Sequence, residues 1–388
     1  MDNLTHGLAG ALLAQAGVRQ RYGRAASVAL IVGSELPDLD ALFDLAGPII
    51  GFQQHRGVTH AFAGGLGLAL LVAAVLYGLL RYRHYWRLVG VLYAGVLLHI
   101  WMDYLTSYGT QILLPFDAGR YTADAVFIID FFYTGIIVAA LLSLRMVRLQ
   151  RYTRYRMGSW LAALVGVVLW FATPWLVQHP LWRQLLGGLG RHIALFALLI
   201  VLASCMTRSW PTEGSLRIGR YGVGALAAYM VLCMVNQQVA KQRFTAALGA
   251  QMAQVKQVSA IPLPGGPLAW RGIAETASSY LVSRISLLSG EITAPRHIPK
   301  GLEQEEVRRT HDYQLVRVFR DFARFPVVEY YRQGQEDIVR YTDLRFVGYG
   351  RETSWFDLKV RFDKTGQVRM IEFLNHVFLP SYPGFKHP

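Results

Sequence analysis

The stretch HIWMDYLTSYGTQILLPFDAGRYTADAVFIID, residues 99–130, begins at the end of an apolar run and carries one histidine, one arginine and four aspartates. His99 and Asp103 are four residues apart, which on a helix places both side chains on one face. An imidazole and a carboxylate at this spacing can bind one metal ion or simply hydrogen bond to each other. The pair alone leaves both interpretations open.

The composition around this stretch is that of a membrane protein. The chain has 388 residues, of which 53% are hydrophobic and only 16% are charged, whereas soluble domains contain about 25% charged residues. About 20 apolar residues cross the hydrocarbon core of a bilayer. With two short N-terminal segments and the run before Asp103, we predict about eight helical segments in a polytopic α-helical membrane protein. The other apolar runs are 61–80, 125–144, 160–177, 193–206 and 223–239.

The character of the chain changes after about residue 240. Residues 241–264 continue the last apolar segment and then reach PLPGGP, which is typical of a linker. Beyond it, β-branched and aromatic runs alternate with turn signals such as DKTG (363–366). We therefore predict a helical membrane domain at 1–240 with its polar site in residues 1–130, a stalk and linker at 241–264, and a small, mostly antiparallel β domain at 265–388. The run YQLVRVFRDF (313–322) is included among the strands.

Basic residues suggest an orientation in the membrane. The loops 19–24, 81–87, 145–156 and 208–220 are rich in arginine and alternate with less basic loops. Cytoplasmic loops collect Lys and Arg, so we expect these four loops in the cytoplasm. The candidate polar site and the C-terminal β domain then lie on the extracytoplasmic side.

Further histidines and aspartates occur at the edges of the early apolar segments. Asp2 and His6 repeat the four-residue spacing, although Asp2 alone is better explained as a helix N-cap. PDLD (37–40) is either a capped turn or a pair of carboxylates presented to a divalent ion. HRGVTH (55–60) is bracketed by two histidines. The candidate metal ligands are His6, Asp38, Asp40, His55, His60, His99 and Asp103.

These ligand types predict a metal-dependent chemistry. Histidine and aspartate without a thiolate pair suit zinc, with manganese or iron as alternatives. Seven candidate ligands exceed what one ion needs, so we expect one or two ions that activate water for hydrolysis. Arg56 and Arg120 are candidates to hold an anionic group such as phosphate.

A site at the surface of the bilayer suits a lipid-linked or phosphorylated substrate. The net charge of +14 is explained largely by the basic loops, and we expect no nucleic-acid partner.

Several of these motifs together resemble a known family. MDNLTHGLAG, the PDLD turn, HRGVTH and residues 99–130 occur in the order found in the YdjM/YfhP-type inner-membrane proteins. The resemblance covers roughly the first 145 residues and implies a multi-pass protein of the bacterial inner membrane. The family is described as metal-dependent hydrolases, and some members as LexA-binding. It implies polar site residues at Asp2 and at the seven candidate ligands, and a later group at Tyr108, Gly109, Arg120, Asp124 and Asp130, of which we add Asp124 to the candidate catalytic residues.

Two other classes of function remain open. A transporter could use intramembrane His and Asp to relay protons or metal ions, although it would need them near the middle of the membrane. A non-enzymatic membrane adaptor could carry the same residues as a structural metal site.

Overall fold

The protein divides into two compact units. The computed structural model describes residues 1–80, 84–149, 213–264, 266–347, 354, 356–374, 376–382 and 385. The first unit comprises Met1–Met234 with Pro264–Gly266, and the second comprises Val235–Leu263 with Pro267–Pro388. The division falls inside one continuous helix, α10 (Glu213–Leu248), whereas the sequence placed it at residue 240.

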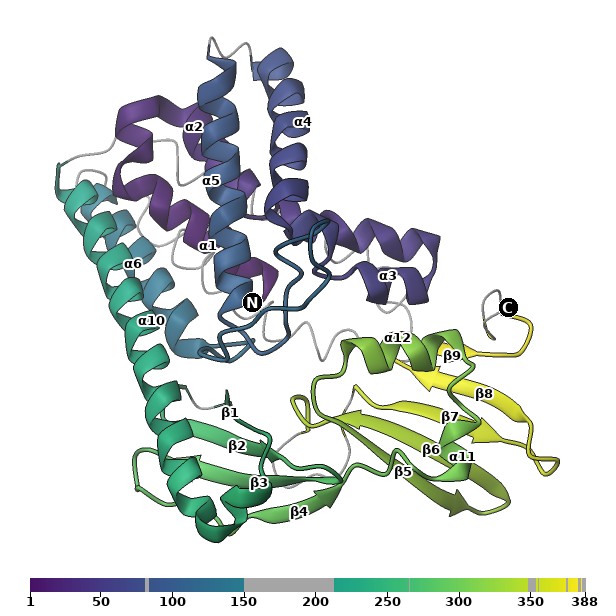
Figure 1. Ribbon diagram of the computed structural model, residues 1–388. Coiled ribbons are helices and arrows are strands. Elements are labelled where there is room, and N and C mark those ends of the chain that lie inside the picture. Colours follow the sequence, from purple (N-terminus) through teal and green to yellow (C-terminus); the bar gives the residue numbers. More distant parts are fainter. Residues whose placement is uncertain are drawn as a thin grey trace. The chain divides into compact units, whose positions relative to one another are not determined.

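The first unit is helical (Figure 1). Two kinks near its start occur at Gly17 and Gly23, whose φ angles of 156° and 83° favour glycine. The second kink lies inside the predicted basic turn 19–24. The elements are α1 (Asn3–Leu13), the π-helical η1 (Ala14–Val18), α2 (Arg19–Gly33), the 3-10 helix η2 (Leu36–Ala46), α3 (Pro48–Gln54), η3 (Val58–His60), α4 (Phe62–Leu80), α5 (Tyr85–Tyr104), α6 (Phe131–Leu149) and the first part of α10.

Several described helices are suited to a bilayer. Phe62–Leu79, Tyr85–Tyr104 and Leu216–Gln254 are long and apolar enough to cross a membrane, and Phe131–Leu144 is a shorter apolar helix. The predicted segments 160–177 and 193–206 lie outside the described residues. A membrane protein with apolar helices is therefore supported, while the number of eight segments and their orientation stay predictions.

Helices α2 and α5 meet at two glycines, Gly33 and Gly95, so no side chain separates their backbones at the closest point. A Cβ atom on Gly95 would lie 2.7 Å from the backbone nitrogen of Ser34, and one on Gly33 would overlap the carbonyl oxygen of Leu92. Small residues at such contacts let membrane helices approach closely. This contact fixes the backbone of Ser34 against α5, the helix that carries His99.

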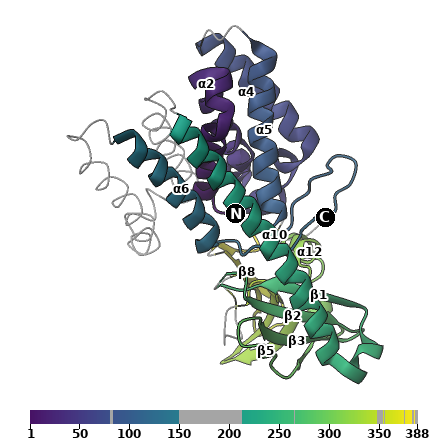
Figure 2. The same ribbon diagram turned by 90° about the vertical axis from the view of Figure 1, so that its left-hand side faces the viewer.

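Asp130 connects α6 to α10. Its Oδ1 accepts hydrogen bonds from the backbone nitrogens of Phe132 and Tyr133, at 2.9 and 2.8 Å, and so caps the start of α6. The hydroxyl of Tyr229 on α10 lies 2.9 and 3.0 Å from the two carboxylate oxygens. The two helices lie side by side in Figure 2 and share one apolar core. Asp130 thus has a clear role in the fold.

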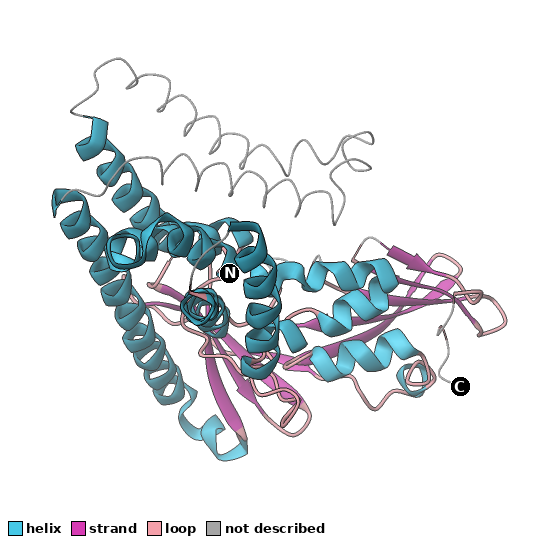
Figure 3. Cartoon of the chain, turned by 90° about the horizontal axis from the view of Figure 1, so that it is seen from above, coloured by secondary structure: helices cyan, strands magenta, loops and turns pink. Residues whose placement is uncertain are grey.

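The second unit contains two antiparallel sheets, whose strands are magenta in Figure 3. This part of the prediction, a mostly antiparallel β domain, is confirmed. The first sheet has the order β1 (Gln257–Pro262), β2 (Ala269–Glu275), β3 (Ser279–Ser286), β4 (Arg296–Pro299). The second has the order β5 (Pro326–Gln333), β6 (Glu336–Asp343), β7 (Leu358–Phe362), β8 (Val368–Phe373), β9 (His376–Phe378), and two helices, α11 (Glu305–Arg308) and α12 (Gln314–Phe322), precede it.

Two local predictions in this unit were wrong. Residues 313–322 form helix α12 instead of a strand, because their apolar residues recur at helical spacing and bury one face, formed by Leu315, Val316, Phe319 and Phe322. Strand β1 lies inside the predicted linker, where Pro262 is accommodated because it ends an edge strand. The DKTG turn was predicted correctly: it connects β7 to β8, and Asp363 accepts hydrogen bonds from the backbone nitrogens of Thr365 and Gln367.

Candidate metal centre

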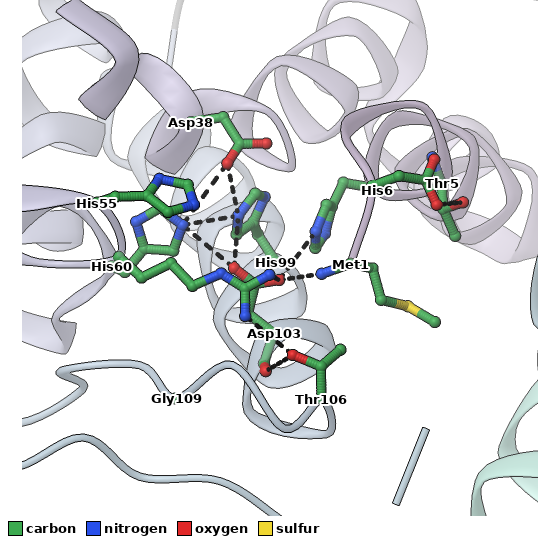
Figure 4. A network of polar contacts seen from close by, with 12 residues as sticks. Met1, Thr5, His6, Asp38, His55, His60, His99, Asp103, Thr106 and Gly109 are labelled. Atoms are coloured by element: carbon green, nitrogen blue, oxygen red, sulfur yellow. Dashed lines mark hydrogen bonds and ion pairs between the residues drawn. The ribbon is translucent and has the colours of Figure 1, made fainter. Parts of the chain in front are cut away.

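Five predicted ligands from four separate elements meet in the first unit. In Figure 4 their side chains point toward one another, and we call them the donor cluster. Helix α5 presents two of them, as the four-residue spacing predicted, while η2, η3 and α1 each add one. The donor cluster consists of His6, Asp38, His60, His99 and Asp103.

The nitrogen and carboxylate atoms of the cluster lie at the spacing of metal ligands. The Nε2 atoms of His60 and His99 are 3.1 Å apart, and they lie 3.2 and 3.5 Å from Oδ2 of Asp103. Oδ1 of Asp38 is 3.7 and 3.5 Å from the same two nitrogens. A tetrahedron with metal–ligand distances of about 2.0–2.1 Å has edges of about 3.3–3.4 Å. Each of the two imidazole nitrogens therefore lies at ligand spacing from both carboxylates. The described side chains that could share an ion form two groups, His6–Asp38–His99 and His60–His99–Asp103.

Buried polar atoms in the cluster also suit a metal-binding site. Among the described residues, both ring nitrogens of His6 and Oδ2 of Asp38 are buried without a hydrogen-bond partner. Buried polar groups are normally hydrogen-bonded or bound to a metal. The His6 ring stacks on that of His99 with 3.6 Å between centroids, and its Nε2 lies 3.3 Å from Oδ1 of Asp103. His6 is thus placed as a fifth donor.

Backbone and carboxylate groups orient the imidazoles. Nδ1 of His99 lies 2.8 Å from the carbonyl oxygen of Ser34, which can only accept, so Nδ1 carries the proton and Nε2 faces the cluster. Nδ1 of His60 lies 3.5 Å from Oδ2 of Asp40. Histidine ligands of metals commonly hydrogen bond through the other ring nitrogen to a carbonyl or carboxylate. His99 has this arrangement, whereas Nδ1 of His60 is hydrogen-bonded to the hydroxyl of Thr59 at 3.1 Å with the Asp40 carboxylate beside it.

Asp40 and His55 occupy a different position from the one predicted. Both lie outside the two groups of described side chains that could share an ion. Oδ2 of Asp40 accepts from the backbone nitrogen of Arg56 at 2.8 Å and lies 3.1 Å from Nδ1 of His55, whose side chain is 43% exposed. Asp40 thus lies on the Nδ1 side of His60, and His55 lies next to Asp40.

This placement separates the two histidines of the HRGVTH loop experimentally. We expect His60→Ala to lose most of the bound metal, because Nε2 of His60 faces Nε2 of His99 and the carboxylates of Asp38 and Asp103. His55→Ala should retain it, since His55 contacts Asp40 and the edge of the His60 ring and belongs to neither possible ligand group. Metal content measured by mass spectrometry on the two purified variants would check this, and loss of metal in both would return His55 to the ligand set.

Arg56 compensates the charge of Asp103. Its Nη2 lies 2.8 Å from Oδ1 of Asp103, and its Nη1 donates to the hydroxyl of Thr106 at 2.9 Å. The guanidinium also lies over the ring of Tyr108, 4.8 Å from its centroid. The α-amino group of Met1 contacts the same Oδ1. Arg56 is thus buried and bound to Asp103, and the anion-binding role that the sequence suggested stays a prediction.

Arg120 and Asp124 also have local partners. Arg120 donates through Nη1 to the carbonyl oxygens of His55 and Gly109, at 3.1 and 3.3 Å, which connects two loops beside the cluster. Asp124 is buried with a φ of 51°; its backbone nitrogen donates to the hydroxyl of Thr122, and its carboxylate accepts from that hydroxyl. Asp124 is outside both possible ligand groups. These contacts support the loop, and the predicted catalytic roles stay untested.

The surroundings favour a charged His60 when no ion is bound. Burial disfavours its protonation, but hydrogen bonds to Asp103 and Asp38 outweigh burial and raise the pKa of His60 to about 9. A divalent ion must displace this proton in order to bind.

The N-terminal part of the chain, which contains the donor cluster, is similar to a known protein family. Residues 1–180 match the family of YdjM inner membrane proteins. This match confirms the resemblance seen in the sequence. The chain is also 30% identical over 92 residues to the "Uncharacterized protein YfhP" of Bacillus subtilis (strain 168), a match that covers 24% of this chain and only 28% of the length of that relative. No solved structure matches the chain significantly.

The YdjM-type region holds the whole donor cluster, together with residues that the sequence did not single out. Asp2 is the N-cap of α1 and accepts from the backbone nitrogen of Thr5, as the simpler interpretation predicted. Ser34 was missed because it acts through its carbonyl oxygen, for which no sequence signal exists. Thr106 could have been suggested by its place in the same motif as Asp103. Glu35, two residues before the PDLD turn, is buried as well.

Proposed function

We propose that this chain is a membrane-bound, metal-dependent hydrolase that acts on a phosphoester or lipid-linked substrate. The observation that carries the proposal is that the Nε2 atoms of His60 and His99 lie 3.1 Å apart and 3.2–3.7 Å from carboxylate oxygens of Asp38 and Asp103. Side chains from three elements reach this spacing in a buried, otherwise apolar bundle, where unpaired charges are costly.

The donor set favours zinc, with manganese or iron as alternatives. Two imidazoles, two carboxylates and no thiolate suit these ions. His99 belongs to both possible groups, His6–Asp38–His99 and His60–His99–Asp103, yet only its Nε2 faces them. One lone pair serves one ion, so five donors support a single ion more simply than two. A pair of ions would need a bridging carboxylate and additional water ligands.

The bound ion and the side chains around the cluster would prepare this site for hydrolysis. A bound ion would supply water with a lowered pKa. Arg56 compensates the charge of the buried Asp103, and Ser34 and Thr59 hold the imidazoles of His99 and His60 with Nε2 toward the cluster. Asp38 is the one donor of the five with an appreciably exposed side chain, at 15%, so substrate would approach from the side of η2.

A structural metal site in a membrane adaptor is the second candidate. The near-complete burial of His6, His60, His99 and Asp103 favours it, because structural sites are closed whereas catalytic sites keep an open position.

Removal of the metal tests the proposal directly. We expect chelation to abolish hydrolysis of a phosphomonoester or phosphodiester by the purified protein in lipid, and zinc or manganese to restore it. Metal content should be about one ion per chain and should fall in the double variant His60→Ala, Asp103→Ala. Full metal occupancy with no turnover on any ester class would favour the structural site.

The location that we propose is the bacterial inner membrane, with the site and the C-terminal domain on the extracytoplasmic side. Helix α10 has 36 residues, more than the roughly 20 that span a bilayer, so its last turns extend beyond the hydrocarbon core. A reporter fused after Arg151 should report the cytoplasm, because Arg151 lies in the basic loop 145–156. A reporter fused after Pro388 should report the outside; a cytoplasmic signal there would contradict the proposed orientation.

A further inference from the structure

A short helical hairpin beside the cluster has two chemically different sides. We call η2 and α3, residues 36–54, the η2–α3 hairpin. It is too short to cross a bilayer. Asp38 and Asp40 face the site, whereas Leu42, Leu45 and Ile50 are exposed, Leu45 by 72%.

The hairpin is built to hold this arrangement. Its two arms touch at Gly51, where a Cβ atom would overlap the carboxylate of Asp44. The arms are therefore closely packed, and the exposed leucines belong to a defined surface. Residues 36–54 include no lysine or arginine, and the exposed charged side chain beside Leu45 is that of Asp44.

A loop on the same side of the unit adds to this apolar surface. Phe116 is 89% exposed, and Leu113 on the same loop is exposed as well. The loop is fixed to the site: the backbone nitrogen of Gln111 donates to the carbonyl oxygen of Arg56, and that of Phe62 donates to the carbonyl oxygen of Ile112, both at 3.0 Å. Exposed apolar residues thus surround the segment that carries the donors.

This surface continues into a helix that is suited to the bilayer. α4 begins at Phe62 and contacts the hairpin. Its exposed side chains are apolar from Phe62 and Leu66 to Leu71 and Val75. Apolar residues of such number, continuous with a candidate membrane span, are unusual on a surface exposed to water.

We infer that the η2–α3 hairpin and the 111–118 loop lie in the outer interface of the bilayer and that the substrate enters the cluster sideways from the lipid. The occupant of the apolar surface is lipid acyl chain, as for interfacial helices that bury one face at the acyl boundary. The position of the hairpin stands on its own, while the entry of substrate rests on the proposed hydrolase. The substrate would then be a phosphoester with a long acyl or prenyl chain.

The position can be measured without any activity. Spin labels are placed singly at Leu45 and Phe116 in a Cys205→Ala, Cys233→Ala background, and the full chain is reconstituted in phosphatidylcholine vesicles. Leu71 on α4 is the lipid-facing control and Lys364, on the exposed DKTG turn, the aqueous control. We expect Leu45 and Phe116 to match Leu71, with collisions with oxygen exceeding those with a water-soluble nickel chelate. Values matching Lys364, or low access to both probes because protein covers the surface, would overturn the inference.

Substrate entry has its own measurement. Leu45→Ser and Phe116→Ser should lower kcat/KM for a long-chain phosphoester by about tenfold, which corresponds to the loss of one buried apolar side chain. Neither should change kcat/KM for a short, water-soluble ester, because neither residue belongs to the donor cluster. Equal losses on both esters would overturn lateral entry. If the spin labels at Leu45 and Phe116 report a lipid environment but neither ester is hydrolysed, the hydrolase is rejected while the position of the hairpin in the membrane stands.

Discussion

Asp103→Asn is expected to remove the metal and the hydrolytic activity together. Oδ2 of Asp103 faces the Nε2 atoms of His60 and His99, and the other oxygen binds Arg56. Asparagine keeps the shape but presents a neutral amide, which is a much weaker ligand than a carboxylate. We expect metal affinity to fall by about 100-fold or more, which is at least the loss found for orienting groups behind metal ligands. Titration with zinc, followed by turnover at saturating metal, separates the two effects.

The control for this variant is Asp117→Asn. Asp117 is exposed on the loop that follows α5 and accepts hydrogen bonds from Gly119 and Tyr121. Its replacement should leave metal content unchanged. Activity retained in Asp103→Asn at full occupancy would contradict a catalytic metal and favour the structural site.

Arg56→Met is expected to cause the largest loss of stability. The guanidinium compensates a carboxylate that is 1% exposed, and removal of one member of a buried ion pair typically costs about 3–5 kcal/mol. Arg56→Lys should cost less, about 1–2 kcal/mol, because lysine keeps the charge but cannot bind Asp103 and Thr106 with one rigid fork. Denaturant unfolding in micelles, at fixed metal concentration, measures both.

A double-mutant cycle shows whether the loss comes from Asp103. In the Asp103→Asn background the carboxylate charge is absent, so Arg56→Met should cost much less there than in the native chain. Equal costs in both backgrounds would show that Arg56 acts mainly through packing on Tyr108.

The sequence predicted the parts of this site that depend on local spacing. His99 and Asp103 face one way because they are one turn apart on α5, and Asp38 is presented by the turn after a proline. His60 was expected at the site because it closes a polar loop at the start of an apolar helix. That these groups converge could be expected only from their common side of the predicted membrane.

The sequence could not distinguish a ligand from the group behind it. Asp40 and His55 are chemically equal to Asp38 and His60, and only the three-dimensional path of the chain places Asp40 against Nδ1 of His60. Arg120 is equally suited to bind an anion or backbone carbonyls, and the structure assigns it carbonyls. In the second unit, α12 was read as a strand because aromatic and β-branched residues favour strands, while the helical spacing of its buried face was overlooked.

The contact between α2 and α5 has a consequence for tolerance to mutation. Any side chain at Gly33 or Gly95 would separate the two backbones and move the Ser34 carbonyl away from Nδ1 of His99. The proton on His99 would then lose the acceptor that keeps Nε2 free for the cluster. Two residues with no side chain thereby control the tautomer of a histidine, so these glycine positions should be as intolerant to substitution as the donors themselves.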